Sequence, residues 1–333
     1  MANVAHAFSP KEWRCAVVSD ATDAGSTGIG TTMYQLDVDS VSYPSLNVMQ
    51  ALDVRSGVGA TLKDEDFFHD RTLRVVELSL SGTLHDDIGH RLLLANICGA
   101  AQADDTNQTI ASGHKIVSHR TAASAGLTNN AASLTVVIQP SDVSNQRGME
   151  FFGCVVTNFT ISADTATEGG RYKWSATIQT GRIPDLDSQV APTITAYANN
   201  TGTTLASASG VKVYGVDAVL NNFTTTIDYP AVFSGITSGG YEVVSRGAEC
   251  AVTHDCQVKY DGNTKDMISN FDGGAVKAEN TFIIVNNGKF GIDTANGVLT
   301  NVALSEGDIM MLDMSLKAVD DGTDALLIVD LED

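Results

Sequence analysis

The chain has 333 residues, 43% of them hydrophobic and 18% charged, which is enough to build one large globular domain or two ordinary ones. Forty acidic residues outnumber 20 basic ones, and the resulting net charge of −20 excludes tight binding of nucleic acid through clustered Lys and Arg. The N-terminus lacks a basic region followed by an apolar one, and no apolar run approaches roughly 18 residues, so we expect neither a secretory signal nor a membrane-spanning helix. The five scattered cysteines are expected to remain free thiols in a reducing cytosol.

Residues 1–30 are interpreted as an N-terminal arm. Within them, residues 15–30 begin like a strand and end in a Gly-containing stretch, which could belong to a dinucleotide-binding fold. That fold requires a helix after the glycines, whereas residues 31–39 alternate like a strand. We therefore expect a flexible arm or loop here and no bound cofactor.

The clearest helix in the sequence is predicted at residues 86–98, after a strand at 75–84. Ile88, Leu92 and Ala95 form one apolar stripe, and two aspartates precede it, as is typical of a helix N-terminus. The two histidines at 85 and 90, with these aspartates, could suggest a metal site. Their spacing of five places them on different helix faces, unlike a helical zinc pair, so we expect helix-start acids and no metal.

The remaining elements are mostly strands separated by clusters of Gly, Asn, Asp and Ser. A polar stretch at 100–132 follows the helix and is interpreted as an inserted loop. The clearest of the strands are predicted at 133–139, 172–179, 280–285 and 309–316, and a weaker helical turn at 263–271. The predicted fold class is therefore mainly β, with one short helix in each half.

A weak internal repeat links the two halves. Residues 155–162 (VVTNFTIS) recur as 298–305 (VLTNVALS), 143 residues later (298 − 155). Each copy is preceded by a helical segment and a strand, and followed by a turn and another alternating strand. The order of elements favours a duplication, and the alternative is one large sandwich with similar strands.

This pattern resembles the tail tube proteins of non-contractile bacteriophage tails, in the larger type where one chain carries two copies of the tube fold. The features that carry the resemblance are residues 75–84, the helix at 86–98 and residues 153–162 in the first half. In the second half they are residues 248–253, the helical segment near Met267, and residues 289–293 leading into the repeated strand.

The resemblance implies a duplicated β-sandwich or barrel, each half flanked by one short α-helix. Its domains would be the arm 1–30, a first repeat 31–183 with the insertion at 100–132, a linker 184–210 and a second repeat 211–333. It implies a structural virion protein of the phage tail, assembled in the bacterial cytoplasm, with no enzymatic activity, cofactor or metal. The partners would be further copies of the chain, three to a ring and stacked into a tube, and the tape measure, terminator and distal tail proteins. DNA would pass through the lumen without specific binding, since an acidic wall repels phosphates.

Two spans lie where the family has its long hairpin loops, at 54–69 and 229–241. We predict that they contact neighbouring rings or subunits. The candidate contact residues are Arg55, Leu62, Phe67, Phe68, Phe233 and Tyr241. Adjacent Phe67 and Phe68 point to opposite faces of an extended segment, so one of them is expected to be available to a neighbour.

The alternative functions are a carbohydrate-binding or adhesive β-sandwich module, or another virion structural protein. Carbohydrate-binding modules usually expose aromatic platforms, and this sequence has only two tryptophans, Trp13 and Trp174. No nucleophile, acid–base pair or metal-ligand spacing with a recognisable signature is present. A hydrolase is therefore the least favoured interpretation.

Overall fold

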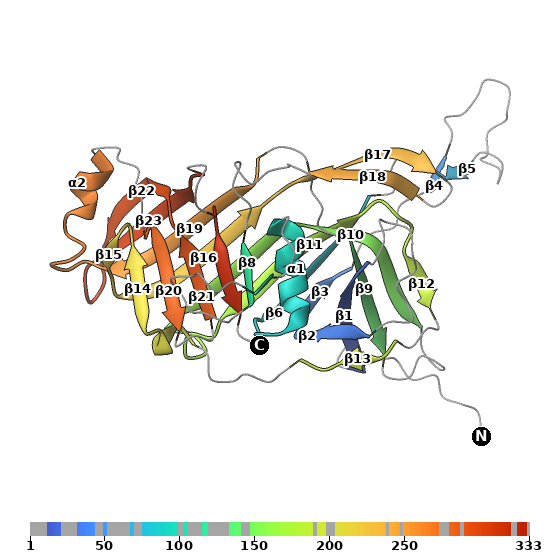
Figure 1. The fold of residues 1–333 in the computed structure, drawn as a ribbon, viewed down its shortest axis with the longest axis horizontal. Helices are drawn as coiled ribbons and strands as arrows, with labels where there is room; N and C mark the ends of the chain where they lie inside the picture. Colours follow the sequence, from blue (N-terminus) through green and yellow to red (C-terminus); the bar gives the residue numbers. More distant parts are fainter. Residues whose placement is uncertain are drawn as a thin grey trace.

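The structure of the protein is a computed structural model. It describes residues 12–20, 32–43, 49–51, 67–69, 75–98, 103–104, 115–118, 133–140, 147–188, 192–197, 204–237, 240–246, 249–272, 280–286, 290–320 and 325–331. Strands dominate these residues, so the mainly β prediction is confirmed (Figure 1).

The centre of the molecule is a run of eight antiparallel strands that passes through both halves of the chain. In spatial order they are β3 (Ser40–Ser42), β6 (Val76–Thr83), β11 (Lys173–Thr180), β10 (Gly148–Asp164), β16 (Leu220–Asp228), β19 (Ala251–Lys259), β23 (Met311–Ala318) and β22 (Gly297–Ser305). Along β6, β11, β19 and β23 buried and less buried residues alternate. One face of this central sheet therefore packs on the core, and the other carries polar side chains.

The first half is closed by an outer sheet on the buried face of the central one. Its strands are β13 (Ile194–Thr195), β2 (Met33–Leu36), β1 (Trp13–Ser19), β9 (Leu134–Pro140), the beginning of β10, and β12 (Asp185–Ser188). Strand β10 serves both sheets, and its pairing with β9 is interrupted between Phe151 and Cys154. Gly153 lies in this interruption at φ 59°, a conformation that favours glycine, and it lets the strand turn from one sheet into the other.

The second half has its own outer sheet. Its strands are β15 (Val216–Asp217), β14 (Gly210–Val213), β20 (Phe282–Asn286), β21 (Phe290–Thr294), β24 (Ile328–Leu331), β8 (Lys115–Ser118) and β7 (Ala103–Asp104). The last two belong to the predicted insertion at 100–132. The insertion therefore supplies strands to the outer sheet of the other half, where β8 pairs with β24.

The helices and hairpins lie outside these sheets. Helix α1 (Ile88–Cys98) begins after Asp87, whose Oδ1 accepts a hydrogen bond from the backbone N–H of His90 at 3.0 Å. Helix α2 (Met267–Asp272) is shorter and starts four residues later than predicted, after a series of turns. Two hairpins complete the described elements, β4 (Met49–Ala51) with β5 (Phe67–His69), and β17 (Ala231–Thr237) with β18 (Gly240–Arg246).

The N-terminal boundary differs from the prediction. Residues 13–19, assigned to the arm, form β1, which pairs with β9 over seven residues. Val17 of β1 is fully buried in the core. The apolar run in β1 is thus a core strand, and the glycine-rich residues after it lie outside the described residues. The segment 184–210, interpreted as a linker, includes β12, β13 and a short 3-10 helix at Leu205–Ser207.

A single hydrophobic cluster joins the two halves. It includes Trp174 and Phe159 of the first half, whose stacked ring centroids are 5.9 Å apart, and Phe223 and Phe282 of the second. A continuous core explains why the two halves form one body, because separating them would expose apolar surface to water.

His254 of β19 is a polar group enclosed in this core. It contacts the hydroxyls of Thr225 and Thr294 at 2.9 Å each, and its ring stacks on Phe282 at 4.3 Å. Burial lowers its pKa from 6.5 to about 3 because the charged imidazole loses hydration.

We expect His254 to make the protein less stable as the pH falls from about 6.5 to about 3. Over this interval the unfolded chain takes up a proton that the folded one excludes, so the free energy of unfolding falls by up to about 1.4 kcal/mol per pH unit. Urea denaturation at pH 7.5, 6.0 and 5.0 measures this slope, and His254→Gln should have a shallower one. Equal slopes for the two proteins would contradict it.

Candidate assembly interface

The strand pairings of the two halves correspond position by position across the central sheet. In the first half Val41, Leu80, Ala176 and Phe159 stand in one row. In the second half the row with the same neighbours is Phe223, Cys256, Met314 and Val302. The pairing of β10 with β11 is irregular between Val156 and Asn158, and that of β22 with β23 between Leu299 and Asn301. The two irregularities are 143 residues apart from each other, which is also the interval between the two matching sequence segments.

The two halves meet where β10 pairs with β16, a contact that we call the junction. Seven residue pairs form it, from Asn158 opposite Asp228 to Asp164 opposite Asn222. In the correspondence above, β22 is the counterpart of β10 and β3 is the counterpart of β16. The strands β3 and β22 end the central sheet. The junction therefore pairs the counterparts of these two end strands.

The strands at the ends of the central sheet carry exposed apolar side chains at matching positions. Leu304 on β22 is 49% exposed, whereas its counterpart Ile161 on β10 is fully buried. Tyr43, directly after β3, is 47% exposed, and its counterpart Thr225 on β16 is fully buried. At the junction Ile161 and Thr225 stand opposite each other. Their exposed counterparts, Leu304 and Tyr43, would therefore form a cross-strand pair if β22 and β3 paired in the same way.

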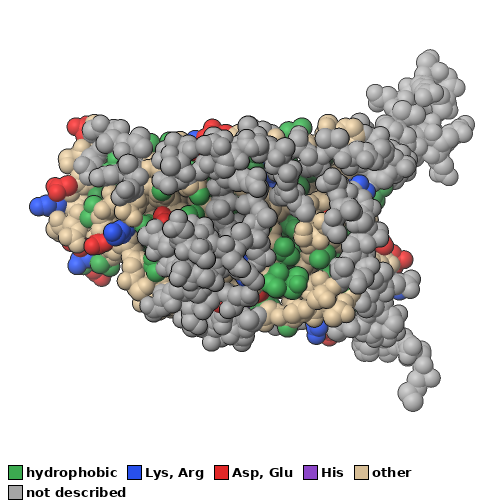
Figure 2. Space-filling model, in the orientation of Figure 1, with side chains coloured by type: hydrophobic (Ala, Val, Ile, Leu, Met, Phe, Trp, Pro, Cys, Tyr) green, Lys and Arg blue, Asp and Glu red, His purple; other side chains and the backbone are tan. Residues whose placement is uncertain are grey.

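Helix α2 shows the same contrast with α1. Ile268 and Phe271 of α2 are exposed, whereas nearly all residues of α1 are buried. Helix α2 packs beside β22, so these side chains enlarge the apolar surface at this edge. Figure 2 shows charged side chains of both signs at the end of the molecule that carries α2.

Arg246, the last residue of β18, ties the two halves together beside the junction. One guanidinium nitrogen donates to the carbonyl oxygens of Val156 (2.6 Å) and Tyr229 (2.9 Å), and the other to the backbone and side-chain oxygens of Asn96. The side-chain Oδ1 of Asn96, near the end of α1, also accepts a hydrogen bond from the backbone N–H of Val156 at 2.8 Å. Burial lowers the pKa of Arg246 to about 10, so the group remains charged at neutral pH.

The polar face of the central sheet carries mostly hydroxyl and amide side chains. Its charged members in the described strands are Glu77, Asp164, Asp228, Asp255, Asp313, Lys173, Lys259 and Lys317. Five acids against three bases leave a modest excess of negative charge on this face. Hydrogen bonds from Ser315 to Asp255 (2.6 Å) and from Gln257 to Asp313 (2.8 Å) hold two of the carboxylates against neighbouring strands.

Not all of the contact residues predicted from the sequence lie in described parts of the chain. Arg55 and Leu62 fall outside the described residues. Phe67 and Phe68 belong to β5, which pairs with β4. Phe233 is half-buried on β17, opposite Val244, and Tyr241 lies on β18 opposite Ile236.

The contact residues predicted from the sequence do not include Leu304, Tyr43, Ile268 or Phe271. Leu304 lies inside the repeated segment, and comparing it with Ile161 would have marked a pair of related positions. The order of strands in the sheet determines that Ile161 is buried and Leu304 is exposed, and the local sequence does not show this.

The paired histidines form a structural polar cluster. His85 Nε2 lies 2.8 Å from Asp37 Oδ2, and His90 Nδ1 lies 2.9 Å from Asp87 Oδ1. The rings are closer than the spacing suggested, with centroids 6.0 Å apart, because His85 precedes the helix. No group of three His, Cys, Asp or Glu in the described parts of the chain is arranged to hold a metal ion.

The cysteines of the described residues are free thiols, and all but Cys250 are buried. Burial raises the pKa of Cys15 and of Cys256 to about 12, which removes the thiolate needed for nucleophilic reactions at neutral pH. Neither helix in the described part of the chain is long and apolar enough to cross a bilayer.

No protein-family model matches the sequence, and no curated protein matches it significantly. Support for a function therefore comes from the geometry of the chain and from the resemblance of its sequence pattern.

Proposed function

We propose that this protein is the major tail tube subunit of a long-tailed bacteriophage, a structural virion protein that assembles into stacked rings around a DNA channel. The observation that carries the proposal is the central sheet, which begins with β3, ends with β22, and contains a pairing of their counterparts at the junction. A chain with these two ends can add a second copy by repeating a contact that it already makes within itself.

Such an interface is heterologous, because β22 of one copy meets β3 of the next and each copy keeps one free edge. Heterologous contacts close into rings when the rotation between copies permits it. Closure also removes the exposed sheet edges, which would otherwise pair without control. We propose that the two halves are copies of the tube fold, so that three chains complete a ring of six similar units.

The polar face of the central sheet is the surface that we assign to the lumen. Its hydroxyl and amide groups offer no cluster of Lys or Arg to DNA, and its acids outnumber its bases. Such a wall would repel phosphates weakly and let the genome slide.

The two hairpins, β4–β5 and β17–β18, are proposed to contact the next ring. Figure 1 draws both along the upper side of the molecule, with β17–β18 running above the first half toward β4–β5. Val232 on β17 is exposed, as a contact surface requires. The terminator, tape measure and distal tail proteins would then bind the ends or the interior of the tube, and the protein would reside in the virion.

Assembly of the purified protein tests this function. We expect size-exclusion chromatography with light scattering to give three times the mass of the subunit, and negative-stain electron microscopy to show rings or tubes with a central channel. Raising the concentration should lengthen the tubes. A protein that remains monomeric at all concentrations would refute the proposal, and rings of six chains would refute the trimer.

A further inference from the structure

The loop before β23 occupies the same structural position as the loop before β11. The carbonyl oxygen of Tyr172 accepts a hydrogen bond from the N–H of Leu84 at 2.9 Å, and that of Met310 accepts one from the N–H of Tyr260 at 3.0 Å. The residues that follow, at 173 and 311, pair with the counterpart strands β6 and β19. Met310 is thus the counterpart of Tyr172.

Tyr172 belongs to the first half, but its side chain packs into the second. Its ring centroid lies 4.0 Å from that of Phe290 on β21 and 6.1 Å from that of Phe223 on β16. The residue is only 3% exposed, and Asn286 of β20 reaches its hydroxyl at 3.5 Å. Tyr172 therefore closes the flank of the second half, between the central sheet and the outer sheet.

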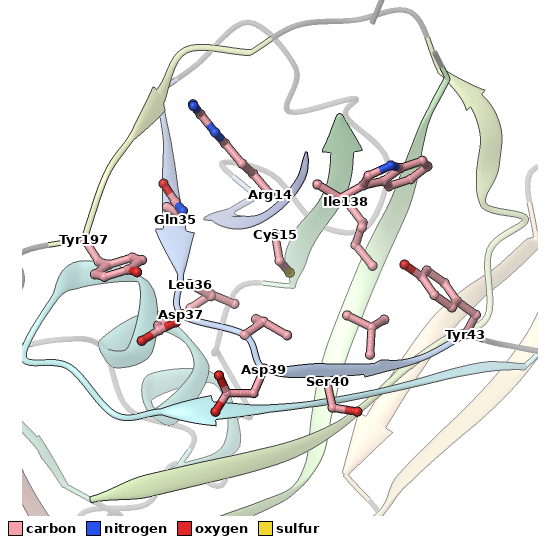
Figure 3. A pocket seen from close by; sticks show the side chains of 13 residues that line it. Arg14, Cys15, Gln35, Leu36, Asp37, Asp39, Ser40, Tyr43, Ile138 and Tyr197 are labelled. Atoms are coloured by element: carbon pink, nitrogen blue, oxygen red, sulfur yellow. The ribbon is translucent and has the colours of Figure 1, made fainter. Parts of the chain in front are cut away.

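The corresponding flank of the first half is open. A pocket of about 360 Å³ lies there, between β1, β2, β3 and β9 (Figure 3). Its apolar lining includes Cys15, Leu36, Val41 and Ile138, and Tyr43 stands at its side. We call this cavity the flank pocket.

The strand positions that line the flank pocket have counterparts in the second half. Val41 corresponds to Phe223, because Val41 pairs with a residue of β6 and Phe223 pairs with a residue of β19, the counterpart of β6. Cys15 on β1 pairs with Ile138 on one side and with Leu36 on the other. Its counterpart Val211 pairs with Ile284 on one side and accepts a hydrogen bond from the backbone N–H of Ala218 on the other. The small side chain of Val41, in place of a phenylalanine ring, leaves space here.

Met310 is 46% exposed, and its neighbour Ile309 is also exposed, beside the β22 edge. We propose that Met310 of one copy enters the flank pocket of the next copy, as Tyr172 enters the second half of its own chain. This inference rests on the head-to-tail association proposed above and names a side chain that would hold neighbouring copies together. An unbranched thioether adapts to an irregular cavity, and it can pack on the apolar part of the lining, beside the polar groups of Arg14, Asp37 and Asp39.

Photo-crosslinking from position 310 tests the inference directly. The full chain is made with p-benzoylphenylalanine at position 310, mixed with isotope-labelled protein and irradiated, and the crosslinked peptides are identified by mass spectrometry. We expect links between light and heavy chains that end in residues 13–15, 36–43 or 138. Assembled rings whose crosslinks lie elsewhere would overturn this inference and leave the proposed function standing. Absence of any association of the unmodified protein would overturn both.

A substitution series gives a second measurement. Met310→Asp should weaken the association of copies by roughly 10- to 100-fold, because it removes an apolar side chain and places a charge in the pocket. Met310→Leu, which is similar in volume, should associate within a few-fold of the natural protein. Since the residue is half exposed in the single chain, neither variant should lower Tm of the monomer. Normal assembly by Met310→Asp would contradict the inference.

Discussion

Leu304→Lys is expected to abolish the association of copies without unfolding the chain. Leu304 is half exposed on an edge strand, so a lysine there remains hydrated in the single subunit. In the proposed interface it takes the place of Ile161, which is fully buried opposite Thr225. Enclosing an unpaired ammonium group costs several kcal/mol, which corresponds to more than a hundredfold in the association constant. Sedimentation velocity across a concentration series measures the loss.

Ala303→Lys is the matched control for this experiment. Ala303 is the exposed neighbour of Leu304 on the same strand, but its counterpart Thr160 lies on the polar face of the central sheet. A lysine at 303 would add the same charge and remain in water after association. If both variants associate normally, or both fail to associate, the proposed β22–β3 contact is wrong.

Arg246→Ala is expected to lower the free energy of unfolding by about 3–5 kcal/mol. The guanidinium donates to oxygens of Val156 and Asn96, in a strand and a helix of the first half, and of Tyr229, in the loop after β16 of the second half. Removing it leaves these buried oxygens without their charged donor, and the methyl group of alanine also leaves a cavity over the Tyr229 ring, 5.0 Å from the guanidinium carbon. Urea denaturation at neutral pH measures the change.

Lys317→Ala provides the comparison for Arg246. The lysine makes an exposed ion pair with Glu249 at 3.1 Å, and such pairs contribute at most about 1 kcal/mol. The two variants each remove one positive charge, so a difference between them reports burial and hydrogen bonding. A loss for Arg246→Ala no greater than that for Lys317→Ala would contradict the role of Arg246 at the junction.

Local patterns in the sequence predicted most of the individual elements. The alternation at 172–179 and 309–316 marked β11 and β23 to within two residues, and the apolar stripe with its leading aspartates marked α1. These signals are strong because alternating burial in a strand, or a stripe on a helix, is determined by neighbours close in sequence.

The sheet order and the interface could not be predicted in the same way. Nothing local in residues 103–118 indicates that β8 pairs with β24, and a core strand in the predicted N-terminal arm was missed because its apolar run precedes glycines. Whether Leu304 is exposed depends on whether a second strand lies beside β22, as β16 lies beside β10, and nothing local in residues 297–305 determines that.

The pairing of β8 with β24 also bears on the order in which the subunit can fold. Val117 pairs with Val329 at a sequence separation of 212 residues (329 − 117), so β8 is synthesised long before the strand that it pairs with. Contacts of such long range form slowly, because the chain must close a large loop before they stabilise it. Until then β24 has only β21 beside it. A growing chain would therefore complete its first half, and expose its β3 edge, well before its β22 edge exists. In a cell making many copies, this delay would keep unfinished chains from extending a ring.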